Sequence, residues 1–458
     1  MTESIIPEPF TKPQGILLGT ATQNSKKQNI YFPLENKDLA SKMWVNIGGS
    51  RSGKSTAAIN RTIGALECGR SVIYLDPTGE AAEIIRDSVP KSLLPDSHIL
   101  CFDFNREDYL PAIHWPTPKG DNIIASDKRT NYMIQFLDRF AETKMGDRTK
   151  RYFRASLKLN TDILNATLMF ANRDYALKRL ETTKDPTLIK TWQTYWKKNI
   201  EKETYAEPVI SRLDSLISDD IIANCILQPP KYTSPWDMHK WLNGDFILGK
   251  RTPYCVLITL PSNKESMNTL ATYLMQDILL AALQRNQIPS DKRELAFVMI
   301  DEPHQMLGAG SGGANSIWSQ MAAELPKYRV GIHFYLHSLI SEQIPSEVKK
   351  VIRGADPHYS LFITDKDEFK ALADEFAPID LEEFMVMPQF DSLNRLWHSG
   401  TKHNLQLTNL PPPIINKKTN RLPYTNRAHL ALETHKRYGR PITEIRTERY
   451  KRQELLYS

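Results

Sequence analysis

Seven short runs of hydrophobic residues predict β-strands. They lie at residues 43–47, 72–76, 98–103, 254–260, 296–301, 331–337 and 359–364. Helical patterns or long connections separate the runs, and this alternation is typical of a mostly parallel α/β sheet. Several runs are hydrophobic throughout, as expected for strands that are covered by helices on both faces.

A different pattern lies between the third and fourth runs. Residues 122–230 are rich in Leu, Lys, Arg, Asp and Thr, and apolar side chains such as Met133, Phe136 and Phe140 recur at helical spacing. We find no convincing strand in this stretch. The pattern therefore predicts an inserted all-helical domain, with the length of a small domain.

These patterns divide the chain into five parts. We expect a flexible N-terminal tail over residues 1–14, the first part of the sheet domain over 15–121 and the helical insertion over 122–230. The second part of the sheet domain follows over 231–410, and a Pro-rich connector with a basic tail occupies 411–458.

Composition and charge narrow the class of protein. The chain has 458 residues, of which 41% are hydrophobic and 24% charged, so a folded protein is expected and disorder is excluded for most of it. No apolar run reaches the roughly 18 residues of a membrane span, and the N-terminus does not resemble a signal peptide. We expect a cytoplasmic protein.

Residues 417–458 hold 11 Lys or Arg and 4 Asp or Glu. This excess of positive charge favours contact with nucleic acid or an acidic partner, although a solvated helix fits equally well.

A glycine-rich motif follows the first hydrophobic run and precedes a predicted helix. It reads Gly48-Gly49-Ser50-Arg51-Ser52-Gly53-Lys54-Ser55 and matches G-x-x-x-x-G-K-[ST]. The N–H groups of such a phosphate-binding loop (P-loop) and the helix N-terminus face the β-phosphate of a nucleotide. Lys54 would bridge the β and γ oxygens, Ser55 would ligate Mg²⁺, and Thr56 would contact the α-phosphate. The motif therefore predicts a site for ATP and Mg²⁺.

A second motif places two carboxylates at the end of a buried strand. The run at residues 296–301 ends in Asp301 and is followed by Glu302, the form of a Walker B strand. Asp301 would hold the Mg²⁺ shell through water, and Glu302 would act as general base on the attacking water. A simple turn at the end of a strand is the alternative.

A third motif carries a family resemblance. Residues 72–80 form the strand after the P-loop helix and read Val-Ile-Tyr-Leu-Asp-Pro-Thr-Gly-Glu. With the P-loop and Asp301-Glu302-Pro303-His304, this stretch resembles the HerA/FtsK superfamily of DNA-pumping ATPases. The resemblance is greatest to HerA-like translocases and to the TraG/TraD-like coupling ATPases of type IV secretion and conjugation. It implies a RecA-like P-loop core, and it adds Asp76 and Glu80 to the nucleotide-binding residues.

The same resemblance implies residues that sense or complete the site. The family usually ends the strand at residues 331–337 with a Gln that senses the γ-phosphate. In this chain the candidates are His337 and Ser338, with Gln343 further on, and His337 also fits a core histidine. Ring-shaped ATPases use an arginine from the neighbouring subunit. Arg329 is the first candidate and Arg353 the second, and each also fits a surface arginine paired with a carboxylate.

Two basic clusters are candidates for contacts with the DNA backbone. Aromatic residues interleave with the cations of the first cluster, which suits stacking with single strands but also fits an ordinary amphipathic helix. The candidates are Lys150, Arg151 and Arg154 in the insertion, and Lys436, Arg437 and Arg440 in the tail.

We therefore expect a homo-hexameric, ATP-driven DNA translocase. Conjugative transfer or mobilisation ranks first as its context, and viral DNA packaging and DNA-end processing or defence are alternatives. A relaxase, a nuclease or a membrane secretion complex would be the partner, with recruitment to the inner face of the membrane. An NTP-dependent assembly factor of a secretion machine is the alternative from another class.

Overall fold

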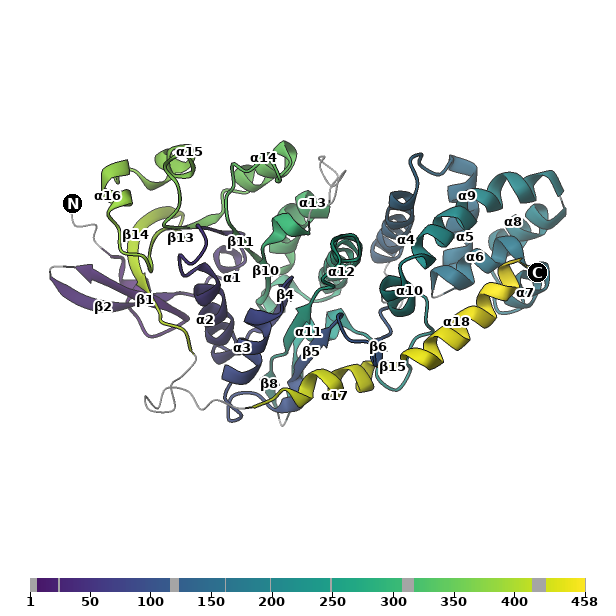
Figure 1. Cartoon of the computed structure of the whole chain (residues 1–458), viewed down its shortest axis with the longest axis horizontal. Coiled ribbons are helices and arrows are strands. Elements are labelled where there is room, and N and C mark those ends of the chain that lie inside the picture. Colours follow the sequence, from purple (N-terminus) through teal and green to yellow (C-terminus); the bar gives the residue numbers. More distant parts are fainter. Residues whose placement is uncertain are drawn as a thin grey trace. The chain divides into compact units, whose positions relative to one another are not determined.

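The computed structural model describes residues 6–23, 25–115, 123–160, 162–197, 199–247, 249–306, 317–413 and 426–457. The chain forms two compact units, whose elements are labelled in Figure 1. The first unit comprises residues 1–105, 238–271 and 281–431, and the second comprises residues 106–237, 272–280 and 432–458.

An eleven-stranded sheet forms the centre of the first unit. Its strands are β1 (Ile16–Gln23), β2 (Lys26–Phe32), β3 (Trp44–Ile47), β4 (Ser71–Asp76), β5 (Ile99–Asp103), β9 (Cys255–Thr259), β10 (Ala296–Asp301), β11 (Val330–Leu336), β12 (His358–Phe362), β13 (Asp391–His398) and β14 (Thr401–Asn409). The spatial order is β2-β1-β14-β13-β12-β3-β11-β10-β4-β9-β5. The strands from β12 to β5 run parallel, and they correspond to the seven predicted runs. The predicted fold class, a mostly parallel α/β sheet, is confirmed.

The remaining strands are antiparallel and extend one edge of the sheet. β13 pairs with β12 and with β14, and β1 pairs with β14 and with β2. The hydrophobic pattern did not predict β13 and β14. Their polar residues explain this, because β13 buries Asn394 and Arg395, and β14 begins with Thr401 and Lys402.

Residues 6–14, which we expected in a flexible tail, pack against this antiparallel edge. A short 3-10 helix spans Glu8–Phe10, and Phe10 is fully buried. Its ring contacts the rings of His398 and His403 at centroid distances of 5.5 and 5.8 Å. The apolar contact explains why this stretch is ordered despite its prolines and charges.

Helices cover both faces of the parallel part of the sheet. α2 (Lys54–Glu67) and α3 (Glu80–Ser88) share one hydrophobic core with side chains such as Tyr74 and Met299. On the other face, Trp318 of α13 (Ile317–Glu324) packs edge-on against Phe334 of β11 at 5.6 Å. The first unit also contains α1 (Lys37–Ala40), α11 (Met238–Asn243), α14 (Ser346–Gly354), α15 (Lys366–Phe376) and α16 (Leu381–Met385). Because helices pack on both of their faces, the parallel strands lie in the interior of the unit.

The second unit is mainly helical. Its helices are α4 (Ile123–Leu137), α5 (Asp147–Leu159), α6 (Ile163–Ala171), α7 (Arg173–Leu180), α8 (Pro186–Lys197), α9 (Asn199–Ile217), α10 (Asp220–Ile226) and α18 (Ile442–Tyr457). Phe170, Trp192 and Tyr195 form an aromatic cluster in its core. β6 (Tyr109–Pro111) and β15 (Gly439–Pro441) form a two-stranded sheet in the same unit. The segment expected as a basic tail thus contributes β15 and α18 to a folded unit.

Two helices, α12 (Lys264–Gln284) and α17 (His429–Tyr438), have residues in both units. Among the described residues, we find no helix with the length and hydropathy needed to span a membrane.

Candidate active site

Four neighbouring parallel strands carry the predicted chemistry at their carboxyl ends. The strands β3, β11, β10 and β4 lie side by side in that order. The P-loop follows β3, His337 follows β11, Asp301 ends β10 and Asp76 ends β4. Because the carboxyl ends of parallel strands meet at one edge of a sheet, residues that are distant in sequence come together here.

Two glycines give the P-loop its shape. A Cβ on Gly48 would lie 2.6 Å from Phe362 Cβ and 2.6 Å from Ser52 Oγ, so there is no room for a side chain. Gly53 has a φ of +97°, in the left-handed region that favours glycine, and α2 starts at the next residue. The Gly48 N–H donates to the carbonyl of Leu336, the last residue of β11, at 3.1 Å, and the Gly49 N–H donates to that of Ile363, directly after β12, at 3.0 Å. These bonds fix the loop to the sheet.

The loop has polar groups that fit a phosphate. Lys54 is buried, and its Nζ donates to the Gly48 carbonyl at 3.3 Å. Burial lowers the pKa of Lys54, and the charges of Asp301 and Glu302 act in the opposite direction. Ser52 Oγ is also buried, and among the residues that the structure describes it has no hydrogen-bond partner. A bound anion would satisfy both groups, so the structure fits the predicted nucleotide.

The other P-loop residues are more accessible. Ser50 and Arg51 are exposed, as is Ser55, while Thr56 is half-buried. Ser55 and Thr56 lie in the first turn of α2, where N–H groups without helical partners attract anions.

Asp301 is a buried carboxylate beside this loop. Tyr74 donates a hydrogen bond to its Oδ2 atom at 3.4 Å. Burial, with help from the charges of Asp76 and Glu302, raises the pKa of Asp301 to about 7, although the charge of Lys54 acts in the opposite direction. A divalent cation favours the ionised form of a nearby carboxylate and would offset this cost. The residues present therefore fit Mg²⁺.

Glu302, His337 and Lys54 form a continuous polar chain. His337 Nε2 lies 2.7 Å from Glu302 Oε1, and His337 Nδ1 lies 3.4 Å from Lys54 Nζ. The tautomer with its proton on Nε2 satisfies both contacts, because Nε2–H donates to Glu302 and Nδ1 accepts from the Lys54 ammonium. His337 thus connects the phosphate-binding lysine to the predicted general base.

The backbone of Glu302 is held in an unusual conformation. Its φ is +44°, which is uncommon for a residue with a side chain. The Glu302 N–H donates to the Tyr335 carbonyl at 3.0 Å, and Gln305 Nε2 donates to the second carboxylate oxygen. The His304 ring lies 5.4 Å from the His337 ring, and burial lowers the pKa of His304. Such strain is held only where surrounding contacts enforce it, which is common at functional sites.

Asp76 and Glu80 lie outside the polar chain of Lys54, His337 and Glu302. Asp76 Oδ1 accepts from the N–H of Thr78, and Asp76 Oδ2 accepts from the N–H of Ala82, both at 2.9 Å. These bonds fix the turn between β4 and α3. Glu80 is exposed at the start of α3. Asp76 thus acts on the site through its charge near Asp301.

The candidate trans-acting arginines lie away from the P-loop of their own chain. Arg329 precedes β11, at the end opposite His337, and its Nη2 lies 3.3 Å from Asp38 Oδ1. Arg353 is exposed in the last turn of α14. Their action on a neighbouring subunit stays a prediction.

Our sequence analysis did not single out Gln305 or Arg61. Arg61 lies two turns after Lys54 on α2 and is buried over the Trp44 ring, at 4.1 Å from its centroid. It hydrogen-bonds to Asn46 and Ser360. Its charged side chain on the buried face of a helix was the available signal. This network supports the strand that carries the P-loop.

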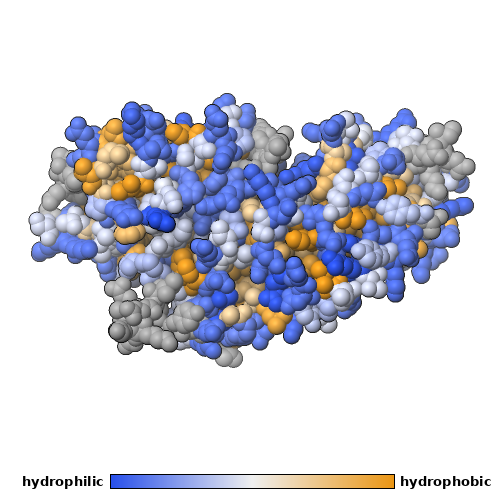
Figure 2. All heavy atoms as spheres, viewed as in Figure 1, coloured by the Kyte–Doolittle hydropathy of each residue, from blue (hydrophilic) through white to orange (hydrophobic). Residues whose placement is uncertain are grey.

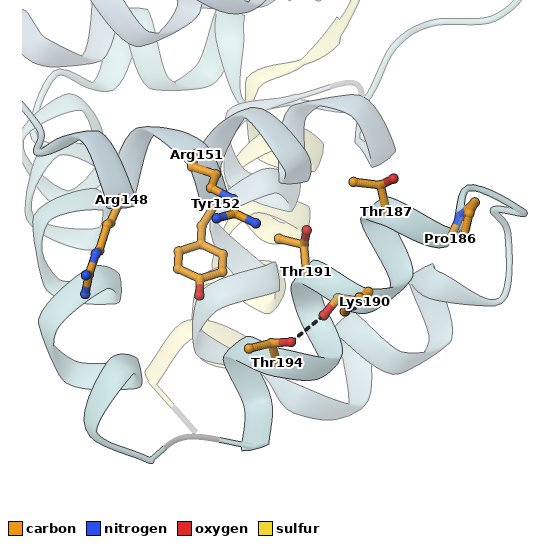
Figure 3. Close-up of a pocket in the computed structure, with 8 residues that line it drawn as sticks. All are labelled: Arg148, Arg151, Tyr152, Pro186, Thr187, Lys190, Thr191 and Thr194. Carbon is orange, nitrogen blue, oxygen red and sulfur yellow. Dashed lines mark hydrogen bonds between the residues drawn. The ribbon is translucent and has the colours of Figure 1, made fainter.

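A basic pocket lies in the helical unit, where α5 and α8 supply its lining (Figure 3). Its volume is about 610 Å³, and it is lined by Arg148, Arg151, Tyr152, Pro186, Thr187, Lys190, Thr191 and Thr194. An adjacent pocket of about 450 Å³ shares Arg151 and includes Arg154.

Some of the cations predicted to contact DNA are exposed, and others bind residues of their own chain. Arg151 is exposed, while Lys150 lies 4.0 Å from Asp138. In the C-terminal segment, Lys436 and Arg437 are exposed. Arg440 instead donates to the side-chain oxygen of Gln228 at 3.1 Å, within its own unit.

No protein family and no curated protein matches the sequence. Solved structures do match. VirB4 of Thermoanaerobacter pseudethanolicus has a TM-score of 0.53 at 13% identity, covering 89% of this chain and 99% of that chain. The plasmid coupling protein TrwB with the non-hydrolysable GTP analogue GDPNP has a TM-score of 0.57 at 11% identity, covering 93% and 96%. TrwB with ADP and Mg²⁺ has a TM-score of 0.51 at 11% identity, covering 92% and 95%.

The chain therefore shares its fold with VirB4 and with the plasmid coupling protein TrwB. The predicted resemblance is confirmed at the level of the fold, including the RecA-like ATPase core.

Proposed function

We propose that the chain is a motor ATPase that uses ATP hydrolysis to move DNA. The observation that carries this proposal is the polar chain from Lys54 through His337 to Glu302, with Asp301 beside it, at one edge of the sheet. The fold shared with VirB4 and with the plasmid coupling protein TrwB supports it.

Each residue of the site has a role in this proposal. The P-loop holds the phosphates of ATP, and Ser55 and Asp301 hold Mg²⁺. The bound nucleotide supplies the γ-phosphoryl group whose transfer to water releases the energy for movement. Glu302 takes a proton from the attacking water, while His337 and Gln305 each hold one of its two oxygens.

We assign the contact with DNA to the pocket between α5 and α8. Arg148, Arg151 and Lys190 supply positive charge there, and the described residues that line it include no Asp or Glu. The hydroxyls of Thr187 and Thr191 add donors suited to phosphate oxygens, whereas Thr194 donates to the Lys190 carbonyl at 2.8 Å. Contacts of this kind bind the backbone without reading the bases.

The leading context is conjugative transfer or mobilisation, in a ring of identical subunits that Arg329 or Arg353 completes. The relation of the fold to a plasmid coupling protein favours it over packaging or DNA-end processing. Recruitment to the inner face of the membrane, through a relaxase or secretion complex, belongs to this proposal.

Steady-state ATPase activity tests the proposal, measured with and without single- and double-stranded DNA at low and moderate salt. We expect stimulation by DNA that weakens as salt rises, because backbone contacts release counterions. Lys54→Ala and Glu302→Gln should abolish turnover, and Glu302→Gln should keep nucleotide binding. Lys370→Ala, an exposed lysine on α15, is the matched control. Robust activity that ignores every DNA would contradict the motor and favour an assembly factor of a secretion machine.

The DNA contact has its own test. Arg151→Glu should remove stimulation by DNA and leave the basal ATPase rate unchanged. Lys178→Glu, an exposed lysine on α7 in the same unit, is the control for the charge change. Equal stimulation of both variants would show that DNA binds elsewhere.

A further inference from the structure

We propose that Phe390 is the platform on which the purine base of the nucleotide stacks. This inference rests on the proposed function, because it needs the P-loop to hold the phosphates. Phe390 lies in the segment that joins α16 to β13. Its ring is packed against the P-loop, since a Cβ added to Gly53 would lie 3.2 Å from Phe390 Cδ1.

The segment is attached to the P-loop on one side and to β14 on the other. Gln389 Nε2 donates to the Arg51 carbonyl at 3.0 Å. The Phe390 carbonyl accepts from the backbone N–H of Asn409 at 3.2 Å and from its Nδ2 at 2.8 Å. These bonds fix the aromatic ring beside the loop without covering it.

The ring is open to a ligand. Phe390 is 57% exposed, and Met385 and Val386 of the same segment are 53% and 80% exposed. Figure 2 shows hydrophobic residues at the surface in the region of α16, at the upper left. Phe384 and Met387 are buried, so the segment packs well through its other side chains. The exposed face therefore needs a separate explanation.

The direction of a bound nucleotide supplies that explanation. Thr56 is the predicted contact for the α-phosphate, and Asn60 lies one turn after it on α2. Asn60 Nδ2 donates to the carbonyls of Leu410 and Pro411 at 3.2 and 3.0 Å. Residues 410–411 thus lie beside α2, and the preceding Asn409 holds Phe390 in place. A nucleotide that continues past Thr56 extends its ribose and base toward this surface.

A purine base fits the chemistry of this surface. Its flat face is apolar and stacks on an aromatic ring, which strengthens binding. The phosphates would remain on the P-loop. Phe390 should therefore add affinity for nucleotides and none for a ligand that consists of phosphates alone.

The experiment compares two ligands by calorimetry, both with Mg²⁺. One is a non-hydrolysable ATP analogue, and the other is inorganic tripolyphosphate. Phe390→Ala should weaken the ATP analogue about tenfold and leave tripolyphosphate unchanged, while Phe390→Trp should keep the wild-type affinity for both. Phe246→Ala, which truncates a phenylalanine that is 77% exposed elsewhere in the same unit, is the matched control.

Other outcomes overturn the inference in distinguishable ways. Equal loss of both ligands in Phe390→Ala would mean that the ring only supports the P-loop. Unchanged binding of both ligands, together with a change in oligomeric state, would assign the apolar face to a contact between copies of the chain. If the wild-type protein bound neither ligand, the proposed function itself would fail.

Discussion

His337 offers the sharpest test of the proposed chemistry. Its Nε2 atom lies 2.7 Å from Glu302 Oε1, within the range of a strong hydrogen bond to a carboxylate. Such bonds contribute about 1.5–3 kcal/mol. If the bond orients Glu302 toward the attacking water, His337→Ala should lower kcat by about 10- to 100-fold.

The effect should fall on kcat and not on KM. The P-loop holds the phosphates, and Lys54 keeps its bond to the Gly48 carbonyl without His337. His337→Gln should recover much of the rate, because its amide can donate to Glu302 and accept from Lys54. Steady-state ATPase kinetics over a range of ATP concentrations measure both parameters, and a fluorescent nucleotide checks binding separately.

Two results would refute this role. A kcat within about twofold of wild type in His337→Ala would show that Glu302 needs no orientation by the ring. A glutamine variant as slow as the alanine variant would show that the two hydrogen bonds are not what matters. His403→Ala, on β14, is the matched control and should leave both parameters unchanged.

Three further predictions concern the loop, the metal and the core. Gly48→Ala should abolish nucleotide binding in a calorimetric titration, because its Cβ would clash with Phe362, whereas Gly354→Ala has space and should bind normally. Burial raises the pKa of Asp301 to about 7, so protons should compete with Mg²⁺ below pH 7. The Mg²⁺ affinity of the nucleotide complex should fall about fivefold from pH 7 to 6 unless Asp301 is replaced by Asn. Burial also raises the pKa of Asp277 to about 8, so between pH 5 and 8 the folded state keeps a proton that the unfolded state has lost. The free energy of unfolding should therefore decrease by up to about 1.4 kcal/mol per pH unit as pH rises from 5 to 8. Urea titrations should show a smaller decrease in Asp277→Asn.

The parallel sheet was predictable because its strands are hydrophobic on both faces. β10 is buried along its whole length, so its composition alone marks it. The antiparallel edge was not predictable in the same way. β14 is partly exposed and rich in polar residues, and one of its two pairing partners, β1, lies almost 400 residues away in the sequence. Pairing over such a separation leaves no local signal in one sequence.

The parts of the candidate site that a local motif defines could be predicted from the sequence. The contacts between residues on different strands could not. The P-loop glycines mark the turn that begins α2, and the acids after β10 mark the end of a strand. The contact between Glu302 and His337 depends on β10 and β11 being neighbours, which no local pattern encodes. The exposure of Phe390 beside Gly53 depends in the same way on the path of the chain after α16.

In the basic C-terminal segment, several arginines have acidic or polar partners within the chain. Arg449 is buried and binds Asp220 at 2.8 Å, and Arg427 is buried and binds Asp96 at the same distance. Arg440 donates to Gln228 in its own unit. These arginines hold the segment to the folded units, so much of its positive charge is balanced within the chain. The exposed cations between α5 and α8, which include Arg151 of the basic cluster predicted in the insertion, are therefore the stronger candidates for contact with DNA.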